Sequence, residues 1–411
     1  MDWSYRAIGR GADTGAGWAA VALGCSLPIS TALDEILLVL ILALWLAGGR
    51  FREKLAAVGD NPIVVPGLLL FGMYIVGLLY GDAAPREALG SLSKAANLLY
   101  IPILLFFFRE ERTRRRALAG FLAALALTIV ISYLLRVGVM PPLAVFHITP
   151  EDAYTPFKHR ITHGFLMAYG AFLFGLEARR QERRSLRIIA AVLALAALAN
   201  VLFVVSGRTG YVVALVLGFY FLLCQWRWRG VAAALLLAAV LGGAISLMPS
   251  SVPHRRISQM ADEMTNWRPG RPEATSVGYR LEYWRNSLRL IAERPLLGVG
   301  TGGFKGAYAA AVRGTGMDPS ENPHNEYLMV TVQLGLAGLA LLMWLFFVQW
   351  RRAALLPGGF AGPAARGLVL LILAASMVTS TLIDHTEGLV YVWMSALLFA
   401  EWSERCPCPS S

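Results

Sequence analysis

Long apolar segments alternate with short charged or Gly/Pro-rich breaks along most of the chain. A helix that spans a membrane needs about 20 mostly apolar residues, with a range of about 17–25. Twelve segments approach or meet this length: 17–30, 33–48, 62–80, 94–108, 117–136, 162–178, 187–204, 208–224, 230–247, 326–350, 365–384 and 386–402. The pattern therefore predicts an all-α, polytopic membrane protein with about twelve transmembrane helices.

Composition points to the same class of protein. Of the 411 residues, 57% are apolar and only 15% are charged, whereas soluble domains have roughly 45–50% and about 25%. Such a chain cannot cover itself with polar surface, which excludes a soluble globular enzyme and a disordered protein. Cys406 and Cys408 have no second cysteine cluster to pair with, so neither a metal site nor a disulfide framework is predicted.

The distribution of basic residues predicts the orientation in the membrane. The terminal segments and one set of short connections hold 21 of the 37 Lys and Arg residues, the opposite connections hold 6, and a long loop, 248–325, holds 10. By the positive-inside rule, which excludes long loops, both termini are cytoplasmic and 248–325 faces outward. We call 248–325 the outer loop. Because orientation accounts for the net charge of +11, no nucleic-acid partner is predicted.

This topology divides the chain into four parts. Residues 1–247 hold transmembrane helices 1–9, and the outer loop follows them. Residues 326–402 hold helices 10–12, and 403–411 form a cytoplasmic tail.

The outer loop contains its own helical patterns. Apolar residues recur at helical spacings of 4, 3, 4 and 3 between 277 and 294, at Val277, Leu281, Trp284, Leu288 and Ile291. A second helix is predicted over 304–312. The first helix either lies on the membrane surface or forms a lid that brings Arg280 over a cavity. The glycine pattern between the two helices, Gly298 to Gly303, formally matches G-x-G-x-x-G. No strand precedes it, so a tight turn is favoured over a dinucleotide site.

Several polar pairs have a structural interpretation that is favoured over a chemical one. His159 and His163 are spaced as i and i+4, but no third ligand lies at a useful spacing, so no metal site is predicted. Two pairs occupy the outer ends of spans, and helix capping is favoured over catalysis for both. These pairs are Asp34/Glu35 and Asp384/His385.

Arg208 lies in a connection of only a few residues between two apolar spans, 206–210. Its side chain either extends to the lipid headgroups or binds an anion, because the planar guanidinium matches the geometry of phosphate. Arg160 opens the sixth span on the same outer side, and the same two interpretations apply to it.

His324 follows an Asn and a Pro at the end of the outer loop. Asn322 as N-cap and Pro323 at the first helical position predict a helix start, which places His324 in the first turn of the tenth span. The helix dipole favours a neutral imidazole at that position. A neutral histidine beside an anion site is suited to act as a general base.

Four motifs together resemble the O-antigen ligase family, within the group that also holds O-antigen polymerases and bacterial O-oligosaccharyltransferases. They are Ser206-Gly-Arg-Thr-Gly210, Gly278-Tyr-Arg-Leu281, Arg294-Pro-Leu-Leu-Gly-Val-Gly300 and Pro323-His-Asn-Glu-Tyr-Leu328. Their order, the twelve-span layout and the large loop before the tenth span agree with this family.

The resemblance implies a membrane glycosyltransferase of the GT-C type that needs no cofactor and no metal ion. Such ligases transfer polysaccharide from undecaprenyl diphosphate to a sugar hydroxyl of lipid A–core, at the periplasmic face of the cell inner membrane. Because the acceptor attacks the anomeric carbon directly, inversion is expected there. Arg208 and Arg280 match the arginines that bind the donor diphosphate, His324 matches the catalytic histidine, and Arg160 matches a further basic position.

The secondary candidates for the site are His163, Tyr327, Asp384 and His385. Two alternative functions remain open. An O-antigen polymerase would use the same donor with a second lipid-linked glycan as the acceptor. A transporter of lipid-linked sugars would place charged residues deep inside the spans, where this sequence has few.

Overall fold

The described part of the computed structural model is entirely helical in its regular elements. It covers residues 2–141, 152–205, 207–226, 228–250, 252–268, 275–315 and 317–404. The predicted all-α fold is confirmed for these residues. Most of the predicted tail, including Cys406 and Cys408, lies outside them, as does Ser206 of the first motif.

The helices follow one another along the whole chain. They are α1 (Asp2–Ser26), α2 (Thr31–Ala47), α3 (Phe51–Gly59), α4 (Val64–Tyr80), α5 (Pro85–Ala95), η1 (Ala96–Leu99), α6 (Tyr100–Phe108), α7 (Glu111–Arg136), α8 (Arg160–Arg180), α9 (Arg184–Ala199), η3 (Asn200–Val204), α10 (Arg208–Trp226), α11 (Trp228–Leu247), α12 (Val252–Asn266), α13 (Ser276–Glu293), α14 (Phe304–Ala311), α15 (Glu326–Ala353), α16 (Gly358–Ser376), α17 (His385–Phe399) and η4 (Ala400–Glu404).

Among the described residues, seven helices are long and apolar enough to cross a membrane, and the bent pair of α2 and α3 raises the number to eight if it is one span. A polytopic membrane protein is thus supported, and the number twelve stays a prediction. The fourth predicted span, 94–108, is wrong at its start. It begins at Pro85, because α5, η1 and α6 continue into one another. The two predicted outer-loop helices are present as α13 and α14, and α12 was not predicted.

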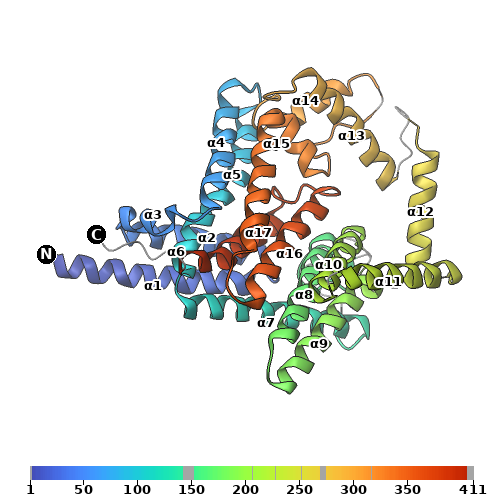
Figure 1. The fold of residues 1–411 in the computed structure, drawn as a ribbon. Coiled ribbons are helices and arrows are strands. Elements are labelled where there is room, and N and C mark those ends of the chain that lie inside the picture. Colours follow the sequence, from blue (N-terminus) through green and yellow to red (C-terminus); the bar gives the residue numbers. More distant parts are fainter. Residues whose placement is uncertain are drawn as a thin grey trace.

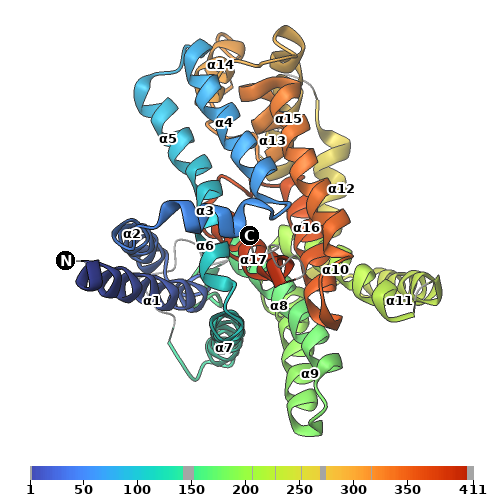
Figure 2. The ribbon, with the colours of Figure 1, turned by 60° about the vertical axis from the view of Figure 1, so that its left-hand side comes forward.

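The helices run in two main directions. In both views α4 and α15 rise towards α13 and α14, whereas α1 and α11 lie across the picture (Figures 1 and 2). Two helices of the outer loop, α13 and α14, therefore lie at one end of α4 and α15, whereas α12 extends from α11 (Figure 1).

The core is centred on α17, in which every residue of 389–399 is buried. Trp393 joins this helix to three others. Its Nε1 donates a hydrogen bond to Ala20 O at 2.9 Å, and its ring lies 5.6 Å from Phe108 and 5.4 Å from Phe121, centroid to centroid. A large aromatic side chain that also satisfies its polar N–H can fix several helices at once.

Two glycines let α8 and α10 approach closely. A Cβ on Gly210 would lie 3.2 Å from the Cα of Gly164, so larger residues would separate the helices. Small residues at a crossing allow this backbone contact in membrane helices. The first residues of the two helices, Arg160 and Arg208, are thereby held at the same end of the pair.

The tenth predicted span is broken inside the protein. Gly335 interrupts α15 with φ 66° and ψ −167°. The segment before α14 supplies partners for the backbone groups that the break frees. Val299 N donates to Val332 O at 2.9 Å, and Leu336 N donates to Pro295 O at 2.8 Å. Irregular backbone at such a depth requires internal partners of this kind.

The glycine pattern of 298–303 continues from this break onto α4. Thr301 N donates to Gly77 O at 3.1 Å, and its Oγ1 donates to Tyr74 O at 2.7 Å. Gly300 has φ +89°, and a Cβ there would lie 2.2 Å from the Cα of Gly81. These glycines therefore form a turn that contacts helix backbone closely, which agrees with the interpretation favoured from the sequence.

Candidate functional site

Arg208 is the first residue of α10, and its side chain is 19% exposed. Its Nη1 lies 3.6 Å from Oε2 of Glu263, on α12. The close packing of Gly207 fixes the start of the helix, because a Cβ there would lie 2.8 Å from the carbonyl oxygen of Arg160. Arg208 thus enters the site from a rigid junction between α8 and α10.

Arg280 lies in the first turns of α13, near Arg208. The side chain of Thr275 caps this helix by accepting a hydrogen bond from Gly278 N at 3.1 Å. Burial lowers the pKa of the Arg280 guanidinium, and the positive charge of Arg208 lowers it further. No carboxylate among the described residues forms an ion pair with Arg280. Two neighbouring guanidinium groups favour the binding of an anion.

Glu263 connects these two arginine helices. Besides pairing with Arg208, its Oε2 accepts a hydrogen bond from Val277 N at 3.2 Å, at the start of α13. Its side chain is only 7% exposed. Glu263 was not predicted from the sequence, because nothing in its local pattern indicates a partner so distant along the chain.

The predicted position of His324 is wrong. It lies before α15, not in its first turn, and has φ 51°. The N-cap is Asn325, whose side chain accepts from Leu328 N at 3.0 Å. The side chain of Asn322 instead accepts from His324 N at 2.7 Å. When an Asn side chain accepts a hydrogen bond from the backbone N–H two residues later, it forms a turn that precedes the helix. The helix therefore starts later than the sequence indicated.

The surroundings of His324 connect it to α13. Its ring stacks on that of Tyr283, with 6.2 Å between the centroids and 30° between the planes. Trp284 Nε1 donates to Pro323 O at 3.1 Å. Burial lowers the pKa of His324, and the charge of Arg280 lowers it further. The imidazole is therefore held neutral near neutral pH. The structure thus brings Arg208, Arg280 and His324 together.

Arg160 borders this cluster, although its side chain is engaged elsewhere. Its backbone N–H donates to Asp152 Oδ1 at 2.9 Å, and its Nη1 lies 3.8 Å from Asp152 Oδ2. Its carbonyl group packs against Gly207, the neighbour of Arg208.

His163 points into the helix bundle. It is buried, and its Nε2 lies 2.9 Å from Asn200 Oδ1. The amide of Asn200 in turn donates to Ser132 Oγ at 2.8 Å. His159 instead accepts a hydrogen bond from Ile161 N at the start of α8. The two histidines thus have separate partners, and each has a structural role in this arrangement.

Tyr327 and Asp384 contact neighbouring backbone and loops. Tyr327 Oη donates to Leu373 O at 2.9 Å, which ties α15 to α16. Asp384 occupies the N-cap position of α17, but its side chain makes no capping bond. Its Oδ2 accepts from Thr379 Oγ1 at 3.1 Å. Asp384 thus occupies the predicted N-cap position, but the capping bond expected from its side chain is absent. Neither residue reaches the Arg208 cluster through a described contact.

Asp34 forms a buried ion pair with Lys158, and the partly exposed His385 lies beside it, so the capping predicted for Asp34 is wrong. Ser30 caps α2, accepting from Leu33 N, whereas Asp34 is fully buried. Lys158 Nζ lies 3.4 Å from Asp34 Oδ2, and His385 Nε2 lies 3.6 Å from the same oxygen. Burial lowers the pKa of Lys158, and the carboxylate of Asp34 opposes that shift. This cluster joins α2 and α17 to the segment before α8.

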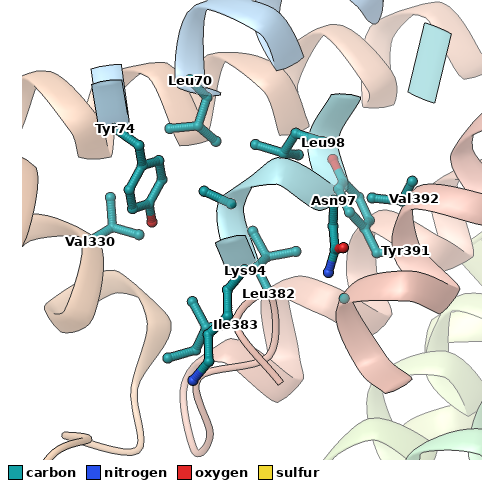
Figure 3. Close-up of a pocket in the computed structure, with 12 residues that line it drawn as sticks. Leu70, Tyr74, Lys94, Asn97, Leu98, Val330, Leu382, Ile383, Tyr391 and Val392 are labelled. Carbon is teal, nitrogen blue, oxygen red and sulfur yellow. The ribbon is translucent and has the colours of Figure 1, made fainter. Parts of the chain in front are cut away.

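A small pocket lies beside the segment that precedes Asp384. Apolar residues of α4, η1, α15 and the segment before α17 line it, with Lys94 beside Leu382 and Ile383 (Figure 3). None of the predicted site residues lines it.

Comparison with known families agrees with the geometry. Residues 191–343 match the family model described as O-Antigen ligase. No curated protein matches the chain. The matched segment includes Arg208, Arg280 and His324, and leaves Arg160 outside. The match supports the resemblance to the O-antigen ligase family that the sequence motifs indicate, over residues 191–343.

Proposed function

We propose that this protein is an O-antigen ligase of the cell inner membrane. It transfers polysaccharide from undecaprenyl diphosphate to a sugar hydroxyl of lipid A–core, on the periplasmic side. The family match supports a membrane enzyme that handles lipid-linked glycans. The observation that carries the proposal is the proximity of Arg208 and Arg280 beside a neutral His324.

The arginines act on the donor diphosphate. The bond between the anomeric carbon and the diphosphate oxygen breaks with its electron pair, so negative charge grows on the leaving group. At an effective dielectric near 20, two charges about 4 Å apart interact by roughly 4 kcal/mol. Fixed cations placed where this negative charge develops stabilise the transition state more than the bound donor, so part of that interaction energy lowers the activation barrier. Arg208 and Arg280 supply these cations, whereas Arg160 lies at the border of the site with its guanidinium 3.8 Å from Asp152 Oδ2.

His324 acts on the acceptor. As the acceptor oxygen bonds to the anomeric carbon, its proton passes to the neutral imidazole. General base catalysis of this kind contributes typically 10²–10⁴-fold. Direct displacement by the acceptor inverts the anomeric centre. The lowered pKa supports this role, because a protonated imidazole could not accept the proton.

The position of α13 supports a site that closes over the donor. One helix carries both Arg280 and the ring of Tyr283 that stacks on His324. Movement of α13 would displace both the diphosphate partner Arg280 and the ring that orients the base. Of the two interpretations that the sequence left open for this helix, we propose the lid.

The experiment is transfer by the purified protein in nanodiscs, with lipid-linked O-antigen as donor. Lipid A–core is offered as acceptor in one reaction and a second lipid-linked glycan in the other. We expect polysaccharide on lipid A–core, and only a small residual amount after Arg208→Ala. Extension of the lipid-linked glycan alone would identify a polymerase. Absence of both products, with folded protein and intact substrates, would overturn the proposal.

A further inference from the structure

The α12 helix and Thr275 line an open surface groove of about 490 Å³. This volume lies in the range of small-molecule sites, roughly 300–1,000 Å³. The side chains that line the groove include Arg255, Ser258, Gln259, Asp262, Glu263 and Asn266. Residues 255, 259, 262 and 266 are exposed and recur at spacings of 4, 3 and 4, which places them along one face of the helix.

Glu263 makes this groove continuous with the arginine cluster. It lines the groove and also pairs with Arg208 at 3.6 Å. Its carboxylate is nearly buried, and its bond to Val277 N fixes it at the start of α13. A ligand in the groove would therefore lie one side chain away from the proposed diphosphate site.

We propose that the α12 groove is a carbohydrate subsite that binds sugar rings next to the reacting centre. This inference rests on the proposed function and adds a location for one of the two glycans. The bound sugar belongs either to the donor polysaccharide or to the acceptor core. Both carry closely spaced hydroxyl groups that the same side chains can bind.

The composition of the groove fits hydroxyl groups better than a charged polymer. Asp262 and Glu263 accept hydrogen bonds, Arg255 donates them, and Gln259 does both. The two carboxylates face one guanidinium, so the lining has no strong excess of positive charge with which to hold a polyanion.

Glu263 also gives the groove a connection to donor binding. In the structure its carboxylate partners Arg208. An incoming diphosphate takes that guanidinium, because it carries more negative charge and a matching fork of oxygens. The carboxylate that is released remains beside the groove, where it accepts a hydrogen bond from a sugar hydroxyl.

The test uses the full-length protein in nanodiscs. Saturation-transfer NMR is recorded with two probes, the core oligosaccharide freed of lipid A and the O-antigen polysaccharide freed of its lipid diphosphate. The variant combines Gln259→Ala, Asp262→Asn and Asn266→Ala. The control combines Glu293→Gln and Asp318→Asn, two exposed carboxylates of the same outer loop.

We expect one probe to receive saturation from the wild type and from the control, and not from the triple variant. The KM of the matching substrate should rise about tenfold or more with kcat nearly unchanged, since two or three hydrogen bonds of ~0.5–1.5 kcal/mol each are lost. The responding probe identifies the donor or the acceptor as the source of the ring. Asp262→Asn alone repeats the test if the triple variant melts at a lower temperature.

Two outcomes would overturn the inference. Either neither probe binds the wild type, or the variants keep the wild-type KM for both substrates. In both cases transfer by the wild type would leave the proposed function standing. Binding of a probe without any transfer by the wild type would remove the proposed function and keep the groove.

Discussion

The ring of Tyr283 stacks on the imidazole of His324, with centroids 6.2 Å apart. The same ring stacks on Tyr279 at 6.2 Å and meets the edge of Tyr308 at 5.7 Å. His324 has a left-handed backbone and lies outside the helix that follows it. Its ring is therefore oriented by an aromatic stack on α13 and not by its own secondary structure.

Replacement of Tyr283 tests this positioning role. Tyr283→Leu should lower kcat about tenfold or more with little change in donor affinity. Without the stacked ring the imidazole is misplaced, which slows proton transfer but leaves the binding of the phosphate groups intact. Tyr283→Phe retains the ring and should retain most of the turnover. Single-turnover transfer and donor affinity, measured in nanodiscs, check both variants. Equal loss in Phe and Leu would show that the hydroxyl matters instead of the stack.

The arginine pair predicts a specific failure of lysine. Arg208→Ala and Arg280→Ala should each reduce transfer to a small residual rate and weaken donor binding, while the folded protein persists. Lysine should rescue either position poorly, because a point charge cannot reproduce the two parallel hydrogen bonds of a guanidinium. Donor affinity of the four variants is the measurement. Near-wild-type transfer with lysine at both positions would reduce the role of the pair to general charge attraction.

If His324 is the base, its replacement should separate chemistry from binding. His324→Ala should lower single-turnover transfer by roughly 10²-fold or more, with donor affinity retained. His324→Gln should be no better, since an amide can bond a hydroxyl but cannot take its proton. Donor binding that falls in proportion to activity would make His324 a phosphate-binding residue.

The pH dependence follows from the lowered pKa of His324. A general base must be neutral to accept a proton. As the pH is lowered, kcat/KM should therefore stay constant past the ordinary histidine pKa of about 6.5 and fall only at more acidic pH. Arg280→Gln removes a positive charge that disfavours imidazolium. The acid limb of its residual kcat/KM should therefore shift to higher pH, although burial still lowers the pKa. An unchanged limb would show that the histidine does not control this titration.

Cysteine labelling tests the predicted orientation. In a variant without the native cysteines, Thr315→Cys should react with an impermeant maleimide on intact spheroplasts, whereas Arg183→Cys should react only after lysis. Both side chains are exposed, so a difference in reactivity reports the side of the membrane. Labelling of 315 only after lysis would place the proposed site on the cytoplasmic side and contradict the proposed function.

The break in α15 predicts a large stability effect at one glycine. Gly335 has φ +66°, and a Cβ there would lie 2.1 Å from Leu296 O. Gly358 has φ +74° and no atom near the position of its Cβ. Gly358→Ala should lower stability by ~1–2 kcal/mol, the cost of the left-handed backbone alone. Gly335→Ala adds a collision with backbone, so its melting temperature in detergent should fall much further. Similar melting of the two variants would contradict the docking of 295–300 on α15.

The sequence by itself determined the fold class and much of the proposed site. Apolar segments of bilayer length and the helical period of 277–294 are local properties, because each depends on residues close together in the chain. They predicted the helical fold and α13, with the correct position for Arg280 on it. Arg208 and His324 were identified by their motifs, and the family match covers both.

Only the tertiary structure decided which side chains meet. The sequence placed His324 inside a helix, whereas the side chain of Asn322 holds it in a turn and Tyr283 orients its ring. Likewise, Glu263 meets Arg208 because α10 and α12 come together in space. A local sequence pattern indicates the helical period and the caps of one helix. Ion pairs between side chains of different helices depend instead on how those helices pack together. That packing is decided by close approaches, such as Gly164 on Gly210, between residues far apart in the chain.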